Sequence, residues 1–153
     1  MQPQLITKPA FTVVGMKVRA TPMTPKIPQL WDQFAPRIDE VQDLAEPHVS
    51  YGLMDQFDPA VGTFNYMAGV SVVQAHDLPA GMAQWEVPAN TYAVFEATLP
   101  TLGDVFGHIY NNWLPASGYQ QAAAPYFERY GETFNPEDPT STVSIYMPVL
   151  KQA

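Results

Sequence analysis

Glu128 is the residue whose surroundings in the sequence most clearly point to chemistry. It lies in the segment Pro125–Tyr130, where aromatic residues and alternation predict a half-buried β-strand. An ionised acid taken out of water costs several kcal/mol unless it is paired, hydrogen-bonded or protonated. Arg129 is next to Glu128 but points to the opposite face, because strand side chains alternate. The positive partner of Glu128 could therefore be a ligand.

Strand alternation also predicts which side chains surround this acid. Tyr126, Glu128 and Tyr130 share one face, and in the strand 141–150 the aliphatic face suits a helix, which turns Tyr146 toward a cleft. Glu128 is expected on this same side, away from the helices, where Tyr146 would complete a polar floor beneath aromatic walls, and such a site favours a lipophilic cation. The alternative is that tyrosine hydroxyls, backbone amides or a buried arginine from the other half of the chain satisfy Glu128.

Other familiar catalytic patterns do not occur. The chain has no cysteine, and His48, His76 and His108 have no spacing that would bring two of them together on a helix. There is no glycine run for phosphate and no nucleophile elbow. We therefore expect neither a cofactor nor a metal.

The charge balance narrows the classes of partner. Fifteen acidic and seven basic residues give a formal charge of −8, and no two basic residues are adjacent. Such a surface repels phosphate backbones, so we expect no direct contact with nucleic acid. No apolar run has the length of a signal peptide core or a membrane span. The sequence favours a soluble, cytoplasmic protein.

Hydrophobic periodicity predicts that the same order of strands and helices occurs twice along the chain. An apolar stripe from Ile27 predicts a helix that Pro36 interrupts, and 102–114 reads as a second helix ending near Trp113. Strands precede and follow each helix, which gives two β-α-β-β units with equivalent elements about 75 to 80 residues apart. The predicted strands are 11–19, 48–57, 64–73, 84–99, 126–130 and 141–150.

These elements predict an α+β fold in a single domain, 1–153, with pseudo-repeats over 9–75 and 82–150. Each small antiparallel sheet would be covered by its own helix. A pseudo-two-fold axis would then relate the units and leave a central cleft for a ligand. Most aromatic residues of the helix stripes are expected in the core. Trp113 lies where the chain turns toward Tyr119, and it could either pack in the core or contact a ligand.

Seven segments in order resemble the GyrI-like, AraC-type effector-binding domain family of multidrug-sensing proteins. They are Trp31–Phe34, Tyr51–Leu53, Tyr66–Val70, Val87–Phe95, Trp113–Tyr119, Phe127–Tyr130 and Ile145–Val149. The resemblance implies a hydrophobic cleft between the two units, in which a glutamate matching Glu128 receives cationic ligands and a tyrosine matching Tyr146 lines the pocket. Without room for a helix-turn-helix module, the chain resembles the stand-alone members.

Three functions follow from this resemblance. The leading one is binding of lipophilic, cationic or aromatic drug-like compounds, with Glu128 as counter-charge and Tyr51, Trp113, Tyr126 and Tyr146 as pocket walls. The alternative is hydrolysis of cyclopropane-bearing or other electrophilic compounds, in which Glu128 activates water and Tyr146 orients the substrate. The third is a gyrase-inhibitor type of interaction. A homodimer or a separate regulator protein is a further possible partner.

Overall fold

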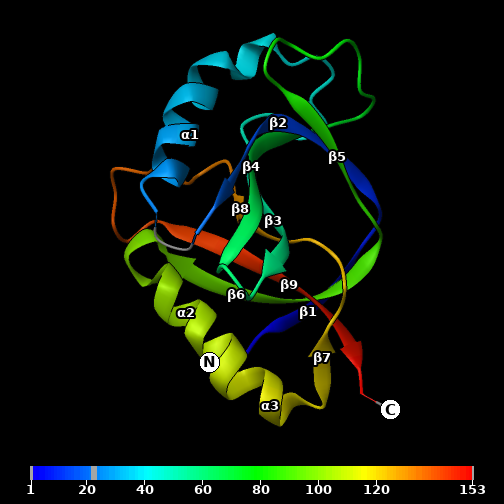
Figure 1. The fold of residues 1–153 in the computed structure, drawn as a ribbon, viewed down its shortest axis with the longest axis vertical. Helices are drawn as coiled ribbons and strands as arrows, with labels where there is room; N and C mark the ends of the chain where they lie inside the picture. The colour runs from blue at the N-terminus through cyan, green and yellow to red at the C-terminus, as the bar shows by residue number, and fades with distance from the viewer. Residues whose placement is uncertain (1, 22–23, 153) are drawn as a thin grey trace.

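A large antiparallel sheet forms the framework of the protein, with helices packed against it (Figure 1). The computed structural model describes residues 2–21 and 24–152, and it has the α+β class that the sequence predicts. The strands are β1 (Gln4–Lys8), β2 (Phe11–Ala20), β3 (Ser50–Asp58), β4 (Thr63–Val72), β5 (Ala83–Val87), β6 (Asn90–Thr98), β7 (Tyr119–Gln121), β8 (Tyr126–Tyr130) and β9 (Thr142–Lys151).

The two halves of the chain join edge to edge in one continuous sheet. The strand order is β1-β6-β9-β8-β3-β4-β2-β5, with β7 paired to β9. We expected two small sheets with a cleft between them, and in the structure their edges are joined, because β3 from the first half pairs directly with β8 from the second. The order β-α-β-β occurs in both halves, and the duplication over 9–75 and 82–150 stays a prediction.

The first helix breaks where the sequence predicts. Helix α1 (Lys26–Phe34) is followed at once by the 3-10 turn η1 (Ala35–Glu40), because Pro36 cannot continue the α-helical hydrogen bonds. Helix α1 packs against β2 and β4 (Figure 1).

The second helix is less regular than its apolar stripe suggests. A short 3-10 turn, η2 (Leu99–Thr101), leads into α2 (Leu102–His108), which packs against β6. The π turn η3 (Ile109–Trp113) follows, and α3 (Leu114–Ser117) then ends at Gly118, whose φ of 78° is the left-handed conformation that glycine adopts readily. No helix within the described ranges is both long enough and apolar enough to cross a membrane.

The single strand predicted over 84–99 is wrong. Residues 83–87 form β5, which pairs with β2, whereas 90–98 form β6, which pairs with β1 and β9 at the other end of the strand order. The break falls at Pro88, which has no N–H to donate to a neighbouring strand. The short strands β1 and β7 were not predicted.

Register assigns each side chain to one face of the sheet. Paired residues point the same way, so Ala68, Gly52, Glu128, Ile145 and Phe95 form one row across five strands. This row lies on the helix-covered face, where Ala68 belongs to the apolar cluster that contains Leu30 and Phe34 of α1, and Phe95 to the cluster of α2. The opposite face has a separate core around Tyr51, Tyr92 and Phe127.

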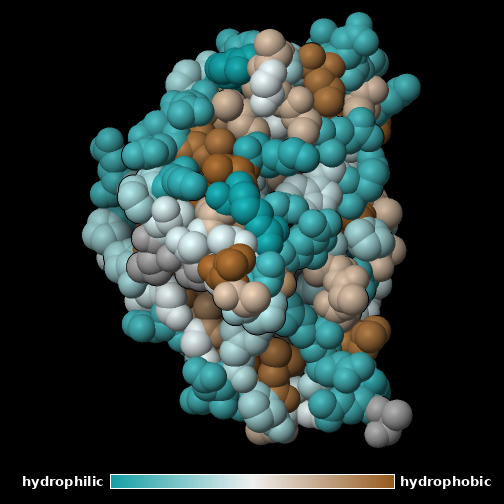
Figure 2. Space-filling view, viewed as in Figure 1, coloured by the Kyte–Doolittle hydropathy of each residue, from teal (hydrophilic) through white to brown (hydrophobic). Residues whose placement is uncertain are grey.

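Hydrophilic residues dominate the surface seen in Figure 2, and the hydrophobic residues on it form small separate groups. This agrees with the formal charge of −8.

The close approach of β2 and β4 provides a test of the fold. Gly15 pairs with Gly69, and a Cβ on Gly15 would lie 2.0 Å from the carbonyl oxygen of Ala68. Because that atom is backbone, we expect Gly15→Ala to lower the free energy of unfolding by about 3 kcal/mol, the upper end of overpacking costs. Urea denaturation measures the change.

Gly103→Ala is the matched control for that substitution. Gly103 is exposed in α2, and a Cβ there would meet no atom within 4 Å. Alanine should raise stability by up to about 1 kcal/mol, because it favours the helix more than glycine does. Equal effects of the two substitutions would contradict the tight β2–β4 contact.

Candidate ligand-binding site

Glu128 is a buried acid whose contacts are tyrosine hydroxyls. The residue is 8% exposed. Tyr130 Oη donates to Glu128 Oε1 at 2.8 Å, and Tyr66 Oη donates to the same oxygen at 3.1 Å. Of the alternatives weighed from the sequence, the structure therefore shows tyrosine hydroxyls at this carboxylate.

Residues of α1 and β3 hold these hydroxyls in place. Trp31 of α1 donates its Nε1–H to Tyr66 Oη at 2.9 Å, and its indole also meets the ring of Tyr130 edge to face at 5.5 Å. Gly52 of β3 is equally necessary, because a Cβ there would lie 2.3 Å from Tyr66 Oη and 2.8 Å from Glu128 Oε1. The glycine leaves the space in which the acid and the tyrosine meet.

No basic side chain of the described residues pairs with Glu128. The ion pairs within 2–21 and 24–152 are Arg37–Glu40, His76–Asp43 and Arg129–Glu46. Arg129 follows Glu128 in β8, and it points to the opposite face, as strand alternation predicts.

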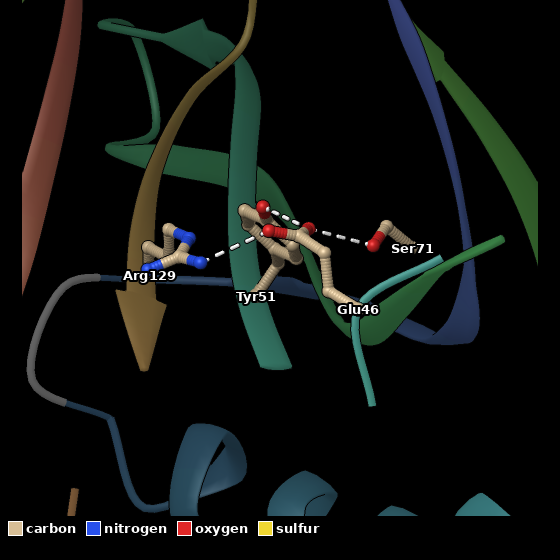
Figure 3. Close-up of polar contacts among 4 residues, drawn as sticks. All are labelled: Glu46, Tyr51, Ser71 and Arg129. Atoms are coloured by element: carbon tan, nitrogen blue, oxygen red, sulfur yellow. Dashed lines mark hydrogen bonds and ion pairs between the residues drawn. The ribbon is translucent and has the colours of Figure 1, made fainter. Parts of the chain in front are cut away.

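On that opposite face, Arg129 is part of a polar network around Glu46 (Figure 3). Arg129 Nη2 lies 2.9 Å from Glu46 Oε1. Tyr51 Oη donates to Glu46 Oε2 at 2.5 Å, and Ser71 Oγ donates to it at 2.7 Å. Glu46 thus has a cation and two hydroxyl donors.

The two acids consequently ionise differently. Burial opposes ionisation of Glu46, but the hydrogen bonds from Tyr51, Ser71 and Arg129 outweigh it and lower the pKa of Glu46. Burial raises the pKa of Glu128, and the hydrogen bonds from Tyr130 and Tyr66 offset this only in part. Glu128 is therefore the acid that a bound cation would stabilise.

The structure separates the predicted pocket residues into two groups. Tyr126 shares the face of Glu128 and meets Phe106 of α2 edge to face at 6.3 Å. Tyr51 and Tyr146 lie on the opposite face, where Tyr146 stacks on Phe127 at 4.7 Å and Tyr51 meets the same ring at 5.4 Å.

The predicted polar floor of Glu128 and Tyr146 is therefore wrong, and so is the expectation that Glu128 faces away from the helices. The β8–β9 register pairs Tyr146 with Phe127 and pairs Glu128 with Ile145. The hydrolytic alternative, in which Glu128 activates water and Tyr146 orients the substrate, would need both side chains on one face, whereas they lie on opposite faces. Hydroxyls near Glu128 come from Tyr66 and Tyr130 instead.

Trp113 also lies apart from Glu128. Its indole stacks on Tyr119 at 6.0 Å and meets Phe95 edge to face at 5.4 Å, at the far end of the second helix.

Sequence reasoning missed two contributors to the site. Trp31 was assigned to the core, and Tyr66 was not singled out. A signal was present in Gly52, because a glycine inside a strand often marks a close approach of another group. No group of three metal-binding side chains occurs in the part of the chain that the structure describes.

With this geometry in view, comparison with known proteins gives the family. The family model of the GyrI-like small molecule binding domain matches residues 1–150, so the chain belongs to that family. The resemblance seen in the sequence is confirmed.

Among curated proteins, the chain is 38% identical over 152 residues to Transcriptional regulator BrlR of Pseudomonas aeruginosa. The match covers 97% of this chain and 56% of BrlR, so the chain spans about half the length of that relative.

Two solved structures show the same fold. SAV2435 bound to tetraphenylphosphonium has a TM-score of 0.77 and 20% identity, with 98% of this chain and 94% of that chain covered. The EcmrR C-terminal domain has a TM-score of 0.70 and 17% identity, with 98% of each chain covered.

The hydroxyl contacts to Glu128 make a testable prediction. Because Tyr130 donates to the carboxylate and stabilises its ionised form, Tyr130→Phe should raise the pKa of Glu128 further. A carboxyl-carbon NMR titration measures it. Tyr92→Phe is the control, since its hydroxyl has no partner among the described residues and the change should leave that pKa where it is. A fall in the pKa after Tyr130→Phe would contradict the contact.

Burial of Glu128 also predicts how stability depends on pH. The folded state has the higher pKa, so the native protein loses stability as pH rises from about 4.5, the unfolded value, through the folded value. Glu128→Gln removes this titration. It should therefore stabilise the protein near neutral pH and have little effect below about pH 4. Denaturation midpoints measured across that pH range test the prediction. A variant that is less stable than the wild type at neutral pH would contradict it.

Proposed function

We propose that this domain binds lipophilic organic cations, with Glu128 as the counter-charge. The observation that carries the proposal is a buried glutamate, 8% exposed, whose carboxylate accepts hydrogen bonds from two tyrosines and has no cation beside it within the described residues. A bound cation would recover the Coulomb energy that Glu128 lacks in the free protein.

The neighbouring side chains suit the apolar part of such a ligand. Trp31, Phe106, Tyr126 and Tyr130 are all half-buried, and they come from α1, α2 and β8 around the acid. Aromatic faces attract positive charge and pack against aromatic substituents. Movement of these rings would give a ligand access to the acid beneath them.

The comparisons supply a supporting chemical precedent. SAV2435, which has this fold, was solved with tetraphenylphosphonium, a cation whose charged phosphorus atom is surrounded by four phenyl groups. The identity of 20% limits that likeness to the fold, so the argument for charge rests on Glu128.

The similarity to Transcriptional regulator BrlR suggests which protein function ligand binding could control. Since the chain matches 56% of BrlR, we propose that ligand binding acts on a regulator module or a separate regulator protein. A homodimer and a gyrase-type partner stay predictions.

Tetraphenylphosphonium and the uncharged triphenylphosphine oxide form a matched pair of probes for this site. Tryptophan fluorescence should show saturable binding of the cation, because Trp31 lies beside the Glu128 cluster. Glu128→Gln should lower the affinity for the cation by about 10- to 100-fold, which corresponds to about 1.4 to 2.7 kcal/mol of binding free energy. The affinity for the oxide should change by no more than about twofold. Lowering the pH through the pKa of Glu128 should reduce the affinity for the cation in the wild type only, because the variant has no carboxylate to protonate.

Glu137→Gln is the control for net charge, since it removes an acid from an exposed loop. It should leave both affinities unchanged. Equal losses for cation and oxide in Glu128→Gln, or an equal loss in Glu137→Gln, would overturn the counter-charge role.

A further inference from the structure

The two carboxylate oxygens of Glu128 have different surroundings. Oε1 accepts hydrogen bonds from Tyr130 Oη at 2.8 Å and from Tyr66 Oη at 3.1 Å. Oε2 accepts none from any residue within 2–21 and 24–152. Because a carboxylate oxygen has two lone pairs, the tyrosines saturate Oε1 and leave both lone pairs of Oε2 for another donor.

A chain of donors keeps the two hydroxyls on Oε1. The indole N–H of Trp31 can only donate, and it donates to Tyr66 Oη at 2.9 Å. Tyr66 in turn donates its own proton to Glu128 Oε1. The ring of Trp31 also packs edge to face against Tyr130, the second donor. Groups of the protein thus hold Oε1, and Oε2 is the oxygen that a ligand would meet.

Oε2 is also accessible from outside. Glu128 keeps 8% of its surface exposed. Of the side-chain polar atoms that the structure describes, Tyr92 Oη and His108 Nε2 are those that are both sealed from solvent and without a hydrogen-bond partner. Oε2 has no partner within the described ranges and is not one of these sealed atoms, so it retains contact with solvent. A ligand group that replaces this solvent would lie against Oε2.

Glu46 shows the opposite arrangement on the other face of the sheet (Figure 3). Arg129 lies 2.9 Å from its Oε1, and Tyr51 and Ser71 both donate to its Oε2. Each oxygen of Glu46 therefore has a partner, whereas only one oxygen of Glu128 has any among the described residues. The free oxygen is a property of the Glu128 site and is not shared by the other carboxylate of this sheet.

A cation can meet Oε2 in two ways. A quaternary ion such as tetraphenylphosphonium brings charge but no hydrogen to donate, so it would displace water from Oε2 and leave the lone pairs unsatisfied. A protonated amine would donate its N–H to Oε2 in a charge-assisted hydrogen bond, which is roughly twice as strong as a bond between neutral groups.

We infer that the Glu128 site selects, among lipophilic cations, protonated amines that donate an N–H to Oε2 over quaternary ions of similar size. This selectivity rests on the cation binding proposed above and narrows its ligand class.

Three benzylammonium ions with the same charge and the same ring test the selectivity. Benzyldimethylammonium and benzyldiethylammonium each have one N–H, whereas benzyltrimethylammonium has none. In ¹⁵N NMR spectra of the full chain, at one pH near neutrality, the shift of the Trp31 indole signal measures each affinity, because this N–H begins the hydrogen-bond chain to Glu128. The signals of Trp85 and Trp113 should stay in place, since both indoles lie in other clusters.

Both ions with an N–H should bind at least about tenfold more tightly than the trimethyl ion. The diethyl ion separates hydrogen bonding from size, because it is larger than the trimethyl ion and still has the donor. An affinity governed by size or by apolar area would instead place the trimethyl ion between the other two.

Glu128→Gln tests which oxygen is responsible. Since Tyr66 and Tyr130 are donors, they should hold the amide oxygen at the position of Oε1 and turn the amide NH₂ group to the position of Oε2. A donor would then face the ligand, so all three ions should bind more weakly and the tenfold preference should disappear. Glu137→Gln, which removes an acid from an exposed loop, should leave the affinities and the preference unchanged.

The outcomes separate this selectivity from the counter-charge role. Equal affinities of the three ions, or an order that follows size, would overturn the N–H selectivity, and loss of all binding in Glu128→Gln would then still support the counter-charge role. A preference that persists in Glu128→Gln would also overturn the assignment to Oε2, as would absence of a saturable Trp31 shift with any of the three ions while tetraphenylphosphonium binds. Affinities that do not change in Glu128→Gln would overturn both.

Discussion

The pairing of β3 with β8 is the contact on which the rest of the structure depends. It joins the two halves of the chain into one sheet, and its register sets Gly52 opposite Glu128 and Tyr51 opposite Arg129. Because side chains alternate, a slip of one residue would exchange the faces of these groups. Alternation within β8 keeps Glu128 and Arg129 on opposite faces, and this register brings each of them to its partners.

Strand alternation made part of the candidate site predictable. Within β8, it correctly placed Tyr126, Glu128 and Tyr130 on one face and Arg129 on the other. The interruption of the first helix at Pro36 was predictable for a similar reason, since the cause is local to one residue. Features that depend on a single stretch of chain are the ones that the sequence predicts well.

Features that depend on two stretches were not predictable in this way. The position of Tyr146 relative to Glu128 depends on the β8–β9 register, which tertiary packing decides and periodicity does not show. The separation of β5 from β6 also required knowledge of their partners, although Pro88 marked the place. The π turn is an exception, because it is local to one stretch and was still missed: it arises inside a regular apolar stripe, so the pattern of residues 102–114 predicted an ordinary helix.

The presence of tyrosines rather than an arginine at Glu128 bears on the cation binding that we propose. A hydroxyl satisfies a lone pair of the carboxylate but leaves its negative charge in place, whereas an arginine would neutralise it and occupy the space of a ligand. Glu46 shows the second arrangement in the same protein, with Arg129 bound and its pKa lowered. Burial raises the pKa of Glu128, so its ionised form destabilises the free protein. A proton or a bound cation would remove this destabilisation.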